Sequence, residues 1–223
     1  MVRIEYLAGL IAVAGCLLTG CASMNKAECS VANWRQIGYV DGTQGTPESR
    51  FAEHQSACAK HGFAADLGTY RAGRIEGLRS YCEPGRGFQE GINGNTYHGV
   101  CPPHLAPQFL TAYSDGKQVH DLRERVEDVA DDMERMADRM RNIEEQSFDV
   151  EQRLRDPALT QEERDRLVDK LRDFRREYQD LQNDRLRLQT DLSTARFALS
   201  QEEARILPAY GMPVGTTRFT TYP

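Results

Sequence analysis

Residues 119–154 read VHDLRERVEDVADDMERMADRMRNIEEQSFDVEQRL, and this stretch decides the fold of the C-terminal half of the chain. Its apolar residues recur at alternating steps of three and four, and charged residues fill most positions between them. Sustained alternation of this kind predicts a long helix that packs along one seam against another helix, as in a coiled coil. Ser147 interrupts the seam. The seam includes Leu122, Val129, Met136 and Ile143.

A second helix with the same pattern follows. Asp156-Pro157 ends the first helix, because proline disfavours helical geometry in the residue before it. Thr160 and Glu163 form a capping-box pattern that begins the next helix. Its seam includes Leu171, Tyr178 and Leu188. We therefore expect an antiparallel helical hairpin over residues 117–206, with its turn at about 156–160.

The region before the hairpin, residues 21–116, is rich in cysteine and glycine. Apart from Cys21, it contains four cysteines, an even number that predicts two disulfides in an oxidising compartment. Three pairings are possible. Nearest-neighbour pairing closes the shortest loops and loses the least chain entropy, so we favour it. The favoured pairs are Cys29 with Cys58 and Cys82 with Cys101.

An aromatic residue followed by small residues at helical spacing recurs in the same region. Small residues three or four apart lie on one helical face and let another backbone approach closely. We therefore expect short helices, packed tightly and joined by disulfides, in a mainly α-helical protein. The four occurrences are Trp34, Gly38, Gly42; Tyr70, Gly73, Gly77; Phe88, Gly91, Gly94; and Phe109, Ala112, Gly116.

The first twenty residues have the pattern of an export signal, with Arg3 before an uncharged apolar stretch from Leu7 to Leu18 that is too short to span a bilayer. The sequence Leu18-Thr19-Gly20-Cys21 resembles the bacterial lipobox, in which the cysteine is acylated and becomes the first residue. We favour Cys21 over the alternative Cys16, which would leave a very short apolar stretch. An ordinary secretory signal is the third reading. Ala22 after the cysteine favours the outer membrane over retention in the inner membrane.

Four motifs give the chain a family resemblance over residues 24–205. It resembles an uncharacterised family of bacterial outer-membrane lipoproteins defined by a domain of unknown function. The resemblance implies an envelope location and a shared fold, but it implies no activity. We expect the protein to face the periplasm. The motifs are Met24-Asn25-Lys26-x-x-Cys29, Trp34-x-x-Ile37-Gly38-x-x-Asp41-Gly42, Tyr70-x-x-Gly73-Arg74-x-x-Gly77-Leu78-x-x-Tyr81-Cys82 and Tyr97-His98-Gly99-Val100-Cys101-Pro102.

One group of residues has the spacing of metal ligands. His54, Cys58 and His61 would lie along one face of a helix. A disulfide at Cys58 would remove its thiolate, and we favour that reading. The sequence contains no H-E-x-x-H, G-x-S-x-G or phosphate-loop motif, so we expect no enzyme and no cofactor.

The 34 acidic and 28 basic residues are interleaved and give a net charge of −6, which argues against nucleic acid as a partner. Residues 207–223, with three prolines, are expected to form a flexible tail. Ala130 and Ala137 leave room for a second hairpin, although we favour a monomer.

We expect a lipid-anchored envelope protein whose helical arm binds another envelope protein or itself. The alternative is a ligand- or metal-binding head, with or without hydrolytic activity.

Overall fold

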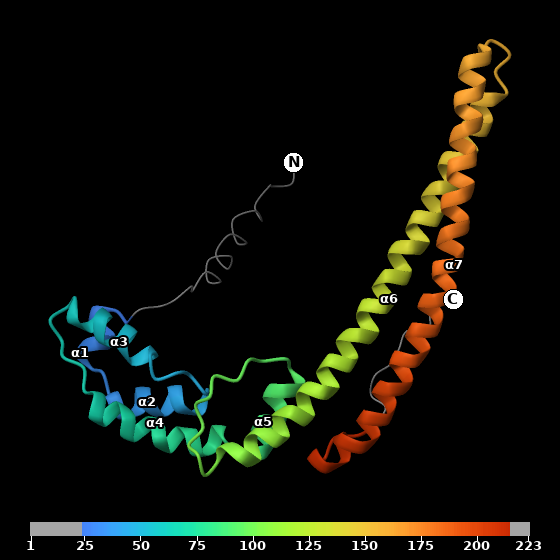
Figure 1. Cartoon of the computed structure of the whole chain (residues 1–223). Helices are drawn as coiled ribbons and strands as arrows, with labels where there is room; N and C mark the ends of the chain where they lie inside the picture. Colours follow the sequence, from blue (N-terminus) through green and yellow to red (C-terminus); the bar gives the residue numbers. More distant parts are fainter. Residues whose placement is uncertain (1–23, 215–223) are drawn as a thin grey trace, which may run out of the picture. The chain divides into compact units, whose positions relative to one another are not determined.

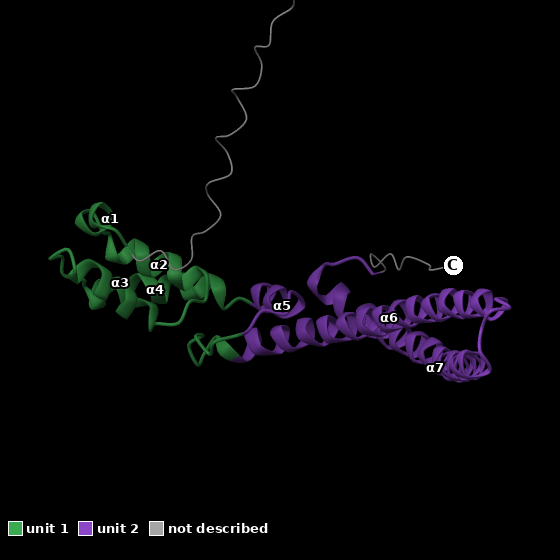
Figure 2. Cartoon of the chain, turned by 90° about the horizontal axis from the view of Figure 1, so that it is seen from above, with its two compact units in different colours: residues 1–83, 97–106 green, residues 84–96, 107–223 purple. Residues whose placement is uncertain are grey.

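The computed structural model describes residues 24–214, which leaves the signal sequence, Cys16 and Cys21 outside the described part. The described residues form helices and no strand, which confirms the mainly α-helical class. The chain divides into two compact units, residues 1–83 with 97–106 and residues 84–96 with 107–223 (Figure 2). The helices are α1 (Lys26–Ser30), α2 (Trp34–Thr43), α3 (Arg50–Ala59), α4 (Leu67–Tyr81), α5 (Pro84–Ile92), α6 (Ala106–Leu154), α7 (Gln161–Ile206) and the 3₁₀ helix η1 (Leu207–Tyr210) (Figure 1).

Helices α2 and α4 form the centre of the first unit, and they run in the same direction. Gly38 faces Tyr70 and Gly42 faces Arg74, one turn further along both helices. A Cβ atom on Gly38 would lie 2.0 Å from the carbonyl oxygen of Tyr70. No side chain fits at that distance, so the two backbones touch only because glycine stands there.

Two disulfides hold this unit together. Cys29 is bonded to Cys58 and Cys82 to Cys101, which is the nearest-neighbour pairing favoured from the sequence. The first disulfide lies in a small apolar core with Trp34, Phe51 and Tyr70. The ring of Phe51 lies 5.8 Å from that of Trp34 and 4.9 Å from that of Tyr70, measured between centroids. Aromatic area and covalent links thus compensate for a core with few aliphatic side chains.

The second unit begins with another parallel pair, α5 against the first turns of α6. A Cβ atom on Gly87 would lie 2.5 Å from the carbonyl oxygen of Phe109, and one on Gly91 would lie 2.1 Å from that of Tyr113. Helix α6 starts at Ala106 and continues to Leu154. It therefore passes without a break through residue 117, where we expected the hairpin to start as a separate domain.

Helices α6 and α7 form the predicted hairpin, which we call the arm. The capping box at the start of α7 is confirmed, with Thr160 accepting from the backbone of Glu163 and the Glu163 carboxylate accepting from the backbone of Thr160. Of the seven seam residues named above, Ile143 is buried. The other six are half-buried. They are Leu122, Val129, Met136, Leu171, Tyr178 and Leu188.

The chain after α7 turns back onto the base of the arm. Leu207 is buried, and the ring of Tyr210 stacks on Phe88 with centroids 4.0 Å apart. The Tyr210 hydroxyl donates to Asp115 at 2.8 Å, and burial together with this bond raises the pKa of Tyr210 to about 12. The first residues of segment 207–223, which we expected to be a flexible tail, are therefore packed, and residues 215–223 lie outside the described part.

Candidate functional site

A polar network lies inside the first unit, between α2, α3 and α4. The Tyr70 hydroxyl donates to Oδ2 of Asp41 at 2.7 Å, and Nε2 of His54 lies 3.3 Å from the same oxygen. Asp41 and Tyr70 are buried, and the side chain of His54 is 12% exposed. One carboxylate therefore joins three helices, each through a different residue type.

The electrostatics of this network favour a charged Asp41. Burial by itself would raise the pKa of Asp41, but the hydrogen bonds from His54 and Tyr70 outweigh it and hold the pKa below the ordinary 3.8. Burial and the neighbouring carboxylate raise the pKa of Tyr70 well above its ordinary value of 10.0. The hydroxyl thus remains a hydrogen-bond donor, and the network stabilises the fold around Asp41.

The residues predicted as metal ligands are not gathered into a site. Cys58 is bonded to Cys29, so its sulfur is not available as a thiolate. His54 contacts Asp41 instead, which the sequence analysis did not predict. The hypothesis of a metal at His54, Cys58 and His61 is therefore wrong in the part that concerns Cys58.

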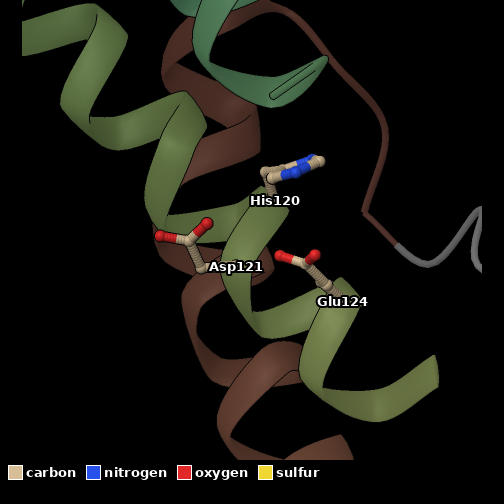
Figure 3. A group of neighbouring side chains, drawn as sticks. All are labelled: His120, Asp121 and Glu124. Carbon is tan, nitrogen blue, oxygen red and sulfur yellow. The ribbon is translucent and has the colours of Figure 1, made fainter. Parts of the chain in front are cut away.

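Within the described residues, one group has donor atoms close enough together to hold an ion. It consists of His120, Asp121 and Glu124, which project from adjacent turns of α6 (Figure 3). The two acidic residues are exposed, and Asp121 is already paired with Lys117. The His120 ring lies against Gly94. Protein groups thus already engage two members of this group, and solvated acidic residues of this kind commonly hold no ion.

A groove opens on one flank of the arm, beside the serine that interrupts the seam. It has a volume of about 510 Å³ and is lined by both helices of the arm. Phe148 of α6 borders it and is 59% exposed. Gln179 and Gln182 of α7 line the same groove, and so they lie on the same flank as Phe148.

From that groove toward the base of the arm, α7 carries a stripe without charge. Placed at about 100° per residue, the stripe is roughly 120° wide and extends for roughly 38 Å. Its residues are all exposed, and its two large apolar side chains, Leu186 and Phe197, are 64% and 63% exposed. We call this set the uncharged stripe; it consists of Gln179, Gln182, Asn183, Leu186, Gln189, Thr190, Ser193, Phe197, Ser200, Gln201 and Ala204.

The rest of the arm surface is densely charged. Most of its ion pairs are exposed and join residues three or four apart on one helix, so each contributes little stability. One pair differs, because Glu203 is buried and accepts two hydrogen bonds from Arg123 at 3.0 and 2.7 Å. This pair links α6 and α7 near the base. The uncharged stripe is thus the exception on an otherwise charged and solvated surface.

Among the described residues, no helix combines the length and the apolar character that crossing a membrane requires. Residues 33–118 match a protein family described as "Protein of unknown function (DUF2799)". The matched residues begin at the residue that caps α2 and end in the first turns of α6, so they contain both parallel helix pairs that pack through glycine, α2 with α4 and α5 with α6. The match is shorter than residues 24–205, over which we expected a resemblance. No curated protein and no solved structure shows significant similarity to the chain.

Proposed function

We propose that this protein, whose residues 33–118 form a domain of unknown function, is a lipid-anchored envelope protein that binds a partner through its helical arm. The exposed uncharged stripe and the adjoining groove carry this proposal. Contiguous surface of this kind on an otherwise charged arm is typical of a contact site. A non-enzymatic role is consistent with a polar network in which Asp41 is held by other protein groups.

The proposed anchor is Cys21. Its support is the sequence Leu18-Thr19-Gly20-Cys21, together with two disulfides, which form in oxidising compartments such as the periplasm. Each buried methylene of an acyl chain contributes about 0.8 kcal/mol, so two or three chains would keep the protein at a membrane. Attachment to the outer membrane, facing the periplasm, is part of this proposal.

The anchor is tested by replacing one cysteine at a time. We expect Cys21→Ala to release the protein from the membrane fraction and to remove the acyl mass. The matched control, Cys16→Ala, should leave the acylated protein in the membrane. Release by Cys16→Ala, or an unchanged protein after Cys21→Ala, would refute the assignment of Cys21.

The contact site is tested by site-specific photo-crosslinking in intact cells. A crosslinking amino acid at Phe148 should give a discrete larger species, because Phe148 borders the groove. The same amino acid at Asp149, exposed but directed about 100° away around α6, should give none. Equal crosslinking from both positions, or none from either, would contradict a docking role for this flank.

A further inference from the structure

We infer that the uncharged stripe of α7 binds the same stripe of a second copy of this chain, with the two helices antiparallel. This inference deepens the proposed function, because it names the partner of the arm. It concerns residues 179–204 and rests on three observations: the chemistry of the stripe, the order of its residues and its length.

The chemistry of the stripe is compatible with itself. It contains amides of asparagine and glutamine, which both donate and accept hydrogen bonds. The hydroxyls of its serine and threonine residues donate to carbonyl oxygens of α7 itself and keep lone pairs that can accept. No charge lies in it, so two copies meet without repulsion between like charges. An acidic or basic partner would find no opposite charge there, although Asp180, Asp184 and Arg187 lie on the neighbouring face of the same helix.

The order of the residues is nearly the same when read from either end. If the helix is placed opposite a second copy about a twofold axis between Thr190 and Ser193, Leu186 of one copy faces Phe197 of the other. Gln182 then faces Gln201, and Thr190 faces Ser193. Both apolar residues therefore meet an apolar residue, which is the self-complementarity that a twofold interface requires. A parallel arrangement would also pair like residues, Leu186 with Leu186 and Gln182 with Gln182, but it would align the two helix dipoles, whereas the antiparallel arrangement opposes them.

The size of the stripe fits a modest dimer. A contact roughly 38 Å long and about 12 Å wide buries on the order of 450 Å² on each copy. Phe148, on the same flank, adds to this area. The total lies near the lower limit for specific interfaces, so we expect dissociation in the micromolar range in solution. Copies concentrated at a membrane surface would associate more completely.

The test uses charge substitutions whose result depends on the register. Leu186→Glu with Phe197→Glu places glutamate opposite glutamate in the antiparallel dimer. Leu186→Glu with Phe197→Lys places glutamate opposite lysine. Within one copy the two positions lie roughly 16 Å apart along the helix, so they do not interact in the monomer.

Sedimentation of the mature chain carrying Cys21→Ser measures the association. We expect wild type to dimerise, the Glu/Glu variant to weaken association at least tenfold, and the Glu/Lys variant to regain most of it. Asp180→Asn with Asp191→Asn, on the charged face of α7, is the matched control and should dimerise like wild type. Circular dichroism and thermal unfolding should be the same for all variants, because both substituted side chains are mostly exposed.

Three outcomes would overturn the inference. They are a wild-type chain that stays monomeric up to about 0.1 mM, a Glu/Glu variant that still dimerises, and a Glu/Lys variant that does not recover. These failures differ from failure of the proposed function. If the chain is monomeric but Phe148 still crosslinks to another protein, the arm remains a contact site and only the dimer is refuted. If the chain dimerises but neither cysteine substitution releases it from membranes, the dimer stands and the Cys21 anchor is refuted.

Discussion

The two glycine-packed pairs, α2 with α4 and α5 with α6, share a backbone arrangement but carry different side chains. In both pairs the helices run parallel, and glycines bring one backbone onto the carbonyl oxygens of the other. A glycine with positive φ ends the first helix of each pair, at Gly45 and Gly94. The glycines of the two first helices correspond at unchanged spacing: Gly38 to Gly87, Gly42 to Gly91 and Gly45 to Gly94.

The second helices correspond in the same way, but here the residue types change. Tyr70 corresponds to Phe109 and Arg74 to Tyr113. Arg74 donates to the carbonyl oxygen of Thr46 at 2.9 Å, and Tyr113 donates to that of Asn95 at 2.7 Å. Each acceptor follows the positive-φ glycine of its pair. The same backbone oxygen is thus satisfied by a guanidinium in one pair and by a phenol in the other.

The acidic residue of each pair shows the largest difference. Asp41 of α2 accepts from the Tyr70 hydroxyl, whereas Glu90 of α5 has no such partner at Phe109. Glu90 accepts instead from Asn95 at 2.9 Å and pairs with Arg86 at 2.8 Å. The close backbone contact is therefore the common element, and the hydrogen-bonded network around Asp41 is particular to the first pair.

The largest effect is expected where the shared contact is blocked. A Cβ atom on Gly73 would lie 1.9 Å from the carbonyl oxygen of Arg35, so Gly73→Ala must separate α2 from α4. We expect a loss of more than about 3 kcal/mol, measured by urea unfolding with the disulfides intact. Hydrogen exchange should show the loss in α2 and α4 and leave α5 unchanged.

Gly85→Ala is the control for this substitution, because nothing lies within 4 Å of a Cβ atom at that position. Alanine there should be neutral or slightly stabilising, since it is the better helix former. If Gly73→Ala were as well tolerated as Gly85→Ala, the close approach would not be what requires glycine.

A smaller loss is expected at Gly45, the positive-φ glycine that follows α2, with Gly62 after α3 as its comparison. Gly45 has φ of 67°, and a Cβ atom there would also lie 2.1 Å from the ring of Tyr81. Gly62 has φ of 81°, but its Cβ would meet nothing within 4 Å. We expect Gly62→Ala to cost about 1 kcal/mol for its backbone alone and Gly45→Ala about 2 to 3 kcal/mol in thermal unfolding. Equal losses would show that the Tyr81 ring moves aside freely.

We expect Tyr70→Phe to lower the free energy of unfolding by about 2 kcal/mol at neutral pH. The substitution gives the first pair the phenylalanine that the second pair has at the corresponding position, Phe109. The pKa of Asp41 is lowered in the folded state, so its contribution is present above the ordinary value of 3.8 and is lost as pH falls through the lowered value. Tyr70→Phe removes one of the hydrogen bonds that lower this pKa. Its deficit should therefore shrink in acid, as measured by unfolding at several pH values below about 5.

Tyr113→Phe is the matched control for this pH dependence. The Tyr113 hydroxyl donates to a backbone carbonyl, not to a carboxylate. Its removal should cost a similar or smaller amount that does not vary over the same acid range. Parallel pH profiles for the two variants would mean that the bond to Asp41 does not contribute through the charge of that residue.

The sequence was sufficient to predict the arm and the close packing of the short helices that precede it. The heptad pattern and the Thr160 capping box are local signals, and they correctly predicted two helices and their turn. The glycine spacing predicted close contact but not its direction, since parallel and antiparallel helices both need small residues on one face. The recurring pattern of an aromatic and small residues places Phe88 in correspondence with Trp34, whereas the structure places Gly87 in correspondence with Gly38.

The Asp41 network could not be predicted from the sequence, because its partners His54 and Tyr70 come from two other helices. One signal was present, since Asp41 lies between two packing glycines and an acidic residue on such a face needs partners. The uncharged stripe was missed for a different reason. Its residues are mostly polar and lie outside the apolar seam, so the stripe appears only when the charged residues of α7 are placed around the helix.

The smallest effect is expected for Ala112→Gly, the reverse of Gly73→Ala at the corresponding position of the second pair. Ala112 is 2% exposed and already carries a methyl group, for which there is no room at position 73. Glycine there would lose that buried methyl and add backbone freedom to the unfolded chain, for a total of about 1 kcal/mol. Hydrogen exchange of α5 and the first turns of α6 would locate this loss. A gain in stability would instead mean that the Ala112 methyl strains the second pair, and the two pairs would then require glycine equally at this position.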